Sequence, residues 1–143
     1  MIQTSRLQSL RNVLPVLRQK QPELVLAFRQ AFAGSPGGPR LSSDARHGLA
    51  AEEAAAFLNA LAAGQPKAEE IALQRGAKLA LTGLDSSTIF RVGQLATRFL
   101  LTYAPADLRM LVLGFVEQYM VALLQSYEFM RSGPEPRTGD SPP

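Results

Sequence analysis

The sequence contains no cysteine, no tryptophan and a single histidine, His47. Without cysteine the chain forms no disulfide and no thiolate metal site, and it cannot carry a thioether-linked chromophore. Catalysis usually needs a nucleophile or general base with an orienting partner, and with one histidine and no cysteine the usual pairs are nearly excluded. These absences predict a protein that is not an enzyme and that has no cofactor and no metal site.

Long hydrophobic runs are also missing from the chain. The most apolar stretch runs from Met110 to Leu124 and is interrupted by Glu117 and Gln118. It therefore falls short of the roughly 20 apolar residues that a membrane-spanning helix needs. The first residues are amphipathic and lack the basic and then apolar pattern of a signal peptide. We expect a soluble, cytoplasmic protein without a membrane segment.

Paired carboxylates occur twice, at Glu52-Glu53 and at Glu69-Glu70. Both pairs are expected in the first turns of helices, where the helix dipole favours negative charge. Adjacent residues on a helix point about 100° apart, so neither pair converges on one point. His47 is expected in a polar loop with its ring in solvent. None of these residues predicts a catalytic or metal site.

The spacing of apolar residues predicts helices throughout. No segment alternates polar and apolar residues at period two, so no strand is expected, whereas apolar residues recur at the three- and four-residue steps of amphipathic helices. We predict an all-α, single-domain bundle of about six helices over residues 1–131 and a disordered Pro/Gly-rich tail or linker at 132–143. The expected helices cover residues 4–20 (kinked at Pro15 or split in two there), 21–34, 49–63, 66–82, 85–103 and 105–131, with a long loop at 33–48.

The turn Gly83-Leu84-Asp85 joins two of these helices and is expected to organise the core. Gly83 is suited to the left-handed conformation that ends a helix, and Leu84 to folding back on that helix. Asp85 offers a side-chain acceptor to the first free N–H groups of the next helix. That helix carries one apolar stripe: Ile89, Val92, Ala96, Phe99, Leu100 and Tyr103. Gly76 and Gly93, inside the two arms, predict close helix crossings.

The last helix carries two apolar stripes, which predicts more than one neighbour. At 1.5 Å per residue it would be about 40 Å long, more than a compact domain of this size needs. We therefore expect a homodimer built around this helix. The residues expected at the dimer interface are Val116, Tyr119, Met120, Leu123, Leu124 and Tyr127.

A DNA-binding alternative comes from residues 83–92. The basic excess of the chain lies elsewhere, in residues 1–47, which carry seven Lys/Arg and two acidic residues. We interpret this excess as a solvated helix face and not as a DNA-binding surface. The stretch at 83–92 resembles the turn and recognition helix of helix-turn-helix repressors, which implies that Ser86, Ser87, Thr88 and Arg91 face the major groove. However, Leu79 stands where that motif has a small residue, and the flanking helices are long. Nucleic acid is therefore not the expected partner.

Residues 57–103 resemble the N-terminal sensor domains of the stressosome co-antagonist proteins of the RsbR type. The resemblance is carried by Arg75-Gly76, the Gly83-Leu84-Asp85 turn, the stripe from Ile89 to Tyr103, and Tyr127. It implies a globin-like fold that binds no haem, dimerises and passes a signal to a partner or fused signalling protein. The leading hypothesis is thus a non-enzymatic sensor domain acting through protein contacts, with a small apolar ligand between its helices as a further expectation.

Overall fold

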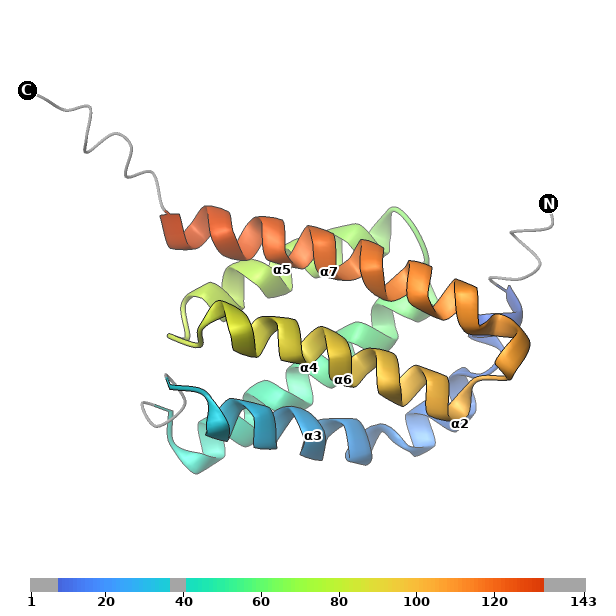
Figure 1. Ribbon diagram of the computed structural model, residues 1–143, viewed down its shortest axis with the longest axis horizontal. Coiled ribbons are helices and arrows are strands. Elements are labelled where there is room, and N and C mark those ends of the chain that lie inside the picture. Colours follow the sequence, from blue (N-terminus) through green and yellow to red (C-terminus); the bar gives the residue numbers. More distant parts are fainter. Residues whose placement is uncertain (1–7, 37–40, 133–143) are drawn as a thin grey trace, which may run out of the picture.

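A computed structural model describes residues 8–36 and 41–132 of the chain. These residues form an all-α single domain of six α-helices, as the apolar spacing predicts, and the described part contains no strand (Figure 1). The predicted tail at 132–143 lies outside the described residues except for Ser132, which is the last residue of α7. No helix in the described part is long and apolar enough to cross a membrane. The helices are α2 (Leu14–Gln19), α3 (Gln21–Gly34), α4 (Ser43–Ala63), α5 (Lys67–Ala80), α6 (Ser86–Tyr103) and α7 (Arg109–Ser132), with a short 3₁₀ helix η2 (Ala106–Leu108) before α7.

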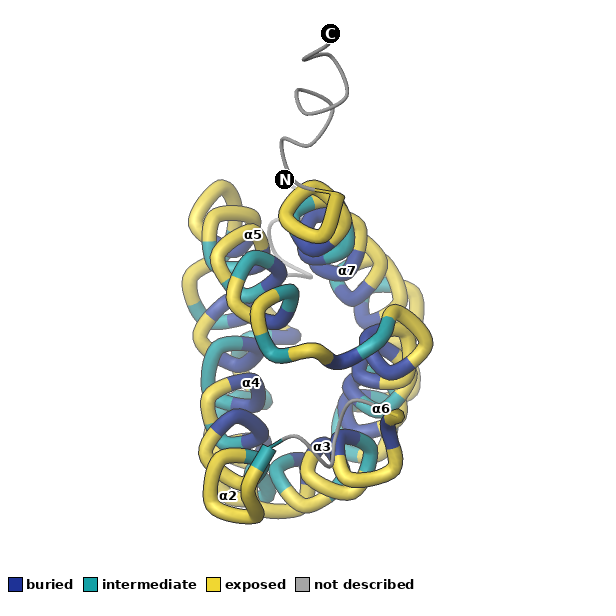
Figure 2. Tube along the Cα trace, turned by 90° about the vertical axis from the view of Figure 1, so that its left-hand side faces the viewer, coloured by how far each residue is buried: buried dark blue, intermediate teal, exposed yellow. Residues whose placement is uncertain are grey.

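Five of the helices form a closed ring around the core. Neighbours around the ring are α3, α4, α5, α7 and α6, and α6 packs back against α3. Figure 2 shows α4 and α5, with α2, on one side and α3, α6 and α7 on the other, and the buried residues face the space between them. The short helix α2 covers one end of the ring, where its Leu17 is buried.

The two helices on either side of the central turn, α5 and α6, do not pack against each other. Helix α5 packs on α4 and α7, whereas α6 packs on α3 and α7. The turn at residues 81–85 therefore carries the chain from one row of helices to the other (Figures 1 and 2). Helix α7, which comes last in the chain, is the element that contacts both, and this explains its two apolar stripes.

Within the turn, most of the expected features are confirmed. Gly83 has a φ of 87°, and the side chain of Leu84 is fully buried. The carbonyl of Leu84 accepts a hydrogen bond of 2.6 Å from the hydroxyl of Tyr127, which fastens the turn to α7. Asp85 is the N-cap of α6, but its carboxylate accepts hydrogen bonds from hydroxyl groups instead of from backbone N–H groups.

The long loop predicted at 33–48 is wrong over its second half. Helix α4 begins at Ser43, because the hydroxyl of Ser42 caps it by accepting a 3.0 Å hydrogen bond from the N–H of Ala45. His47 therefore lies on a helix, where it is exposed. Glu52 and Glu53 lie in the middle of α4 and not in its first turn, so the helix dipole does not explain them.

Both predicted close crossings are present, and they differ in kind. A Cβ atom at Gly76 would lie 2.0 Å from the carbonyl oxygen of Leu123, so α5 and α7 meet backbone to backbone. A Cβ at Gly93 would lie 3.0 Å or more from the side chain of Met120. At Gly93, α6 therefore packs against the flexible side chain of Met120 and not against the backbone of α7. Pro15 lies at the start of α2, after a separate helical turn at residues 8–11, so the N-terminal segment is split in two.

Candidate functional site

The residues expected at a dimer interface belong mostly to the core of the single chain. Of the six, the structure buries Val116, Tyr119, Met120, Leu123 and Tyr127 and half-buries Leu124. They are covered by α5 on one flank of α7 and by α6 on the other. Tyr119, Leu123 and Tyr127 are therefore not a free surface on the folded chain, whereas Val116, Met120 and Leu124 line a groove between α6 and α7. The physical reason is that α7 has two helical neighbours inside the domain, so its two stripes do not require a second subunit.

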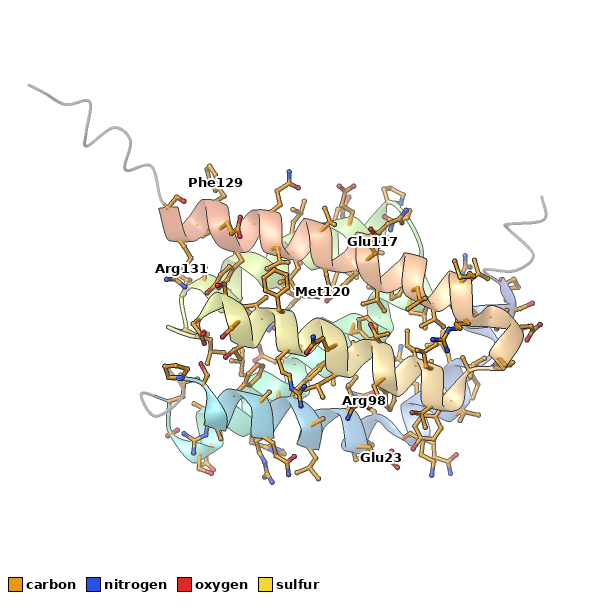
Figure 3. The ribbon with its side chains drawn as sticks, viewed as in Figure 1. Glu23, Arg98, Glu117, Met120, Phe129 and Arg131 are labelled. Atoms are coloured by element: carbon orange, nitrogen blue, oxygen red, sulfur yellow. The ribbon has the colours of Figure 1, made fainter. Side chains whose placement is uncertain are left out.

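An apolar surface is nevertheless present where α6 and α7 face outward. The side chains of Phe90 and Val121 are 56% and 61% exposed, and Leu113 lies beside them with 36% exposed. They flank a groove of about 350 Å³ between the two helices, whose lining includes Gly93, Met120 and Leu124. We call this surface, defined by Phe90, Gly93, Leu113, Met120, Val121 and Leu124, the α6–α7 face. Figure 3 shows Met120 at the junction of the two helices.

The α6–α7 face carries little polarity. Among the residues that line its groove, Glu117 is the charged one, and Gln94 and Thr97 are polar. The hydroxyl of Thr97 donates a 2.9 Å hydrogen bond to the carbonyl of Gly93 in its own helix, so it is already satisfied. Exposed apolar patches with a few polar groups at the edge are typical of sites where proteins bind one another. The sequence alone named Met120 and Leu124 of this face as interface residues, but it did not single out Phe90 and Val121, because these two fall outside the apolar stripes.

A second cluster lies on the opposite flank of α7 and is buried. The side chain of Glu53 on α4 is only 2% exposed and accepts a 2.6 Å hydrogen bond from Nε of Arg75 on α5. Arg75 also contacts Glu52 at 3.2 Å, and Lys78 contacts the same Glu52 oxygen at 3.2 Å. Burial raises the pKa of Glu53 to about 7, against the opposing effect of Arg75. A signal for this cluster existed, because Glu53 stands between Ala50 and Phe57 on one helical stripe.

Tyr119 extends the buried cluster from α7. Its ring packs edge-on against Phe57, with 5.3 Å between ring centroids, and stacks with Phe115. Its hydroxyl is buried and has no hydrogen-bond partner among the described residues. Burial, followed by the charge of Glu53, raises the pKa of Tyr119 far above its usual range, so the phenol stays protonated. The cluster joins α4 to α5 through ion pairs and α4 to α7 through packed aromatic rings.

Glu53, Arg75 and Tyr119 do not form a recognisable arrangement of catalytic residues. Glu53 is already engaged by Arg75, and no nucleophilic side chain is hydrogen-bonded to it among the described residues. Within residues 8–36 and 41–132, no three His, Asp or Glu side chains lie close enough together to hold a metal ion.

The residues of the DNA-binding alternative do not form one bare surface. Ser86, Ser87 and Arg91 are exposed, but Thr88 is buried and its hydroxyl donates a 2.7 Å hydrogen bond to Asp85. The hydroxyls of Ser35, directly after α3, and of Ser87 donate to the same carboxylate. These three hydrogen bonds hold the pKa of Asp85 well below its usual range. The placement of Thr88 in a major groove is therefore wrong, because the residue joins the start of α6 to the Asp85 cluster.

Fold and surface together define an all-α single domain with an exposed apolar face between α6 and α7. Comparison of the chain with protein-family models, with curated proteins and with solved structures finds no match.

Proposed function

We propose that this chain is a non-enzymatic regulatory domain that acts through protein–protein contacts and forms a homodimer through the α6–α7 face. The observation that carries the proposal is the pair of largely exposed apolar side chains, Phe90 and Val121, on the two sides of an apolar groove. Leaving such a patch in water costs free energy, about 25 cal/mol for each Å² of apolar surface. A protein partner that covers the face recovers that free energy.

A second copy of the chain fits the α6–α7 face because the projecting side chain of Phe90 and the groove lie on the same surface. In a two-fold symmetric contact the same patch is used by both subunits, so it must be complementary to itself. Phe90 projects beside the groove, and the groove floor at Gly93 has no side chain. A two-fold axis through the face lets each copy place its Phe90 in the groove of the other. The flexible side chain of Met120 adapts the floor to such a ring.

The rest of the proposal comes from the family resemblance. It comprises a globin-like arrangement of the helices, a cytoplasmic location, a role in stress signalling, and output to a partner or fused signalling protein. The groove is open along its length, which favours a protein side chain over the small apolar ligand that the sequence also suggested. Nucleic acid is not the proposed partner, since α6 is flanked by α3 and α7 and does not project.

Light scattering over a range of concentrations tests the proposal. We expect the wild-type chain to reach twice its monomer mass of 15.5 kDa. Phe90→Glu places a charge in the contact and is expected to give a monomer with unchanged helical content by circular dichroism. Leu81→Glu is the matched control, because Leu81 is 78% exposed and lies on the turn after α5. A wild-type chain that stays monomeric at high concentration would contradict the homodimer.

A further inference from the structure

A second groove, on the other flank of α6, has a different chemistry. It lies between α3 and α6 and has a volume of about 550 Å³. Its walls include Ala31 on α3 and Leu95 on α6, with Arg91 and Arg98 on α6 and the amide of Gln30 on α3. No aspartate or glutamate is among the described residues that line it. Figure 3 shows Arg98 on the side of α6 that faces α3.

The two arginines of this groove are the charged groups that lack an internal partner there. Arg91 and Arg98 are exposed, and neither has a described carboxylate oxygen within 4 Å. Arg75 on α5, in contrast, is paired with Glu52 and Glu53. The nearest carboxylate along α6 is that of Asp85 at its N-cap, and its charge is already stabilised by three hydroxyl groups.

The spacing of the arginines sets the geometry of a ligand. Seven residues on a helix are about two turns, so Arg91 and Arg98 stand roughly 10 Å apart on one side of α6. Two carboxylates three residues apart in a polyproline II chain, which has three residues per turn and rises about 3.1 Å per residue, lie on one side of the chain with nearly the same separation. Guanidinium groups bind carboxylates in a planar, two-pronged geometry. Ala31 and Leu95 form an apolar wall between the two arginines, where the carbon atoms of a bound peptide would lie.

We propose that the α3–α6 groove binds an acidic segment of a partner protein through Arg91 and Arg98. Charge complementarity carries the choice of occupant, since two unpaired cations line the groove and the carboxylate of Asp85, beside one end of it, is already hydrogen-bonded to the hydroxyls of Ser35, Ser87 and Thr88. A DNA duplex is the less suitable anion, because the arginines line a groove between two helices and do not stand on a projecting helix. This site is separate from the α6–α7 face, so it does not depend on the proposed homodimer.

Titration of the ¹⁵N-labelled chain, followed by NMR, tests the proposal with a defined probe. The probe is a capped peptide with Glu-Ala-Ala-Glu at its centre, and its matched control has Gln-Ala-Ala-Gln there. We expect the acidic peptide to shift the Nε–H resonances of Arg91 and Arg98 and to bind about tenfold more tightly than the control. Added salt should weaken this difference. Equal binding of the two peptides would overturn the proposal.

Variants and a competitor assign the binding to the groove. Arg91→Gln and Arg98→Gln should each lower the affinity about threefold, whereas Arg29→Gln, an exposed position on α3 outside the groove, should not change it. A short DNA duplex that shifts the same resonances at lower concentration than the peptide would also overturn the proposal. Repeating the titration with Phe90→Glu separates this site from the α6–α7 face, because peptide binding should persist in that variant.

Discussion

The two flanks of α7 are packed in different ways. On the α5 flank, Gly76 brings two backbones together, and an added Cβ would lie 2.0 Å from the carbonyl oxygen of Leu123. On the α6 flank, the nearest atoms to an added Cβ at Gly93 belong to the side chain of Met120. The first contact leaves no room for adjustment, whereas the second ends on an unbranched, flexible side chain. The α6 flank is also where the exposed groove lies.

The buried charges follow the same division. The ion pair of Glu53 and Arg75 and the ring of Tyr119 lie on the α5 flank, behind tightly packed helices. The α6 flank has the exposed side chains of Phe90 and Val121. This difference indicates that the α5 flank holds the domain together, and that the α6 flank is the one available for binding. Substitutions of the same kind on the two flanks separate these roles.

The largest effect is expected from Gly76→Ala. The new Cβ meets the backbone of Leu123, so the helices must move apart, and we expect a loss of about 3 kcal/mol of unfolding free energy, the upper end for overpacking. Urea unfolding measures it. Gly48→Ala in α4 is the control, because nothing lies within 4 Å of the added atom and helix propensity favours alanine by up to about 1 kcal/mol. Equal stability of the two variants would contradict the backbone contact.

The next largest effect on the free energy of unfolding is expected from Glu53→Gln, and this effect depends on pH. In the folded chain the pKa of Glu53 is raised to about 7 from an ordinary 4.5, so the folded state holds a proton that the unfolded chain releases. The stabilisation from this proton is complete below the ordinary pKa and is lost as the pH rises through 7. The wild type should therefore lose up to about 3 kcal/mol relative to Glu53→Gln over this range.

Urea unfolding of both proteins below pH 4.5 and above pH 7 measures the difference. Glu52→Gln is the matched control, because its side chain is exposed and contacts the same Arg75. The pKa of Glu52 is lowered by its hydrogen bond with Lys78, so its contribution to stability has the opposite sign of pH dependence. A pH-independent difference between the wild type and Glu53→Gln would show that burial does not dominate at this site.

The smallest effect is expected from Gly93→Ala. Met120 can rotate away from the added atom, and alanine is the better helix former, so the unfolding free energy should stay within about 1 kcal/mol of the wild type. Thermal unfolding beside Gly76→Ala measures the contrast. A loss as large as that of Gly76→Ala would mean that the two flanks are equally rigid, and it would remove the basis of the comparison.

Much of the fold could be predicted from the sequence because the residues that start, stop and orient a helix lie close together in the chain. The boundaries of α3 and α6 follow from Pro22, Asp85 and the apolar spacing, and Gly76 correctly indicated a close crossing. The last helix was expected from residue 105, but α7 begins at Arg109, after the 3₁₀ helix η2. The start of α4 was missed because the stretch 33–48 is rich in glycine and serine. Its capping residue, Ser42, is one of several candidates in that stretch, and composition does not choose between them.

The arrangement of helices and the sites were harder to predict, because they depend on contacts between distant residues. Two apolar stripes on α7 are consistent with either a second helix or a second subunit, and the structure shows that α5 and α6 occupy both. The ion pair between Glu53 and Arg75 joins residues 22 positions apart. Phe90 and Val121 become neighbours on one face only after α6 and α7 pack together.

The central claim, that the α6–α7 face joins two copies of the chain, has one direct test. The sequence has no cysteine, so Val121→Cys introduces a single thiol, and a two-fold axis through the face brings the two thiols near each other. A short bismaleimide should convert this variant to a covalent species of twice 15.5 kDa, while Leu81→Cys, on the turn after α5, stays monomeric. Equal cross-linking of the two variants, or none in Val121→Cys, would contradict the account.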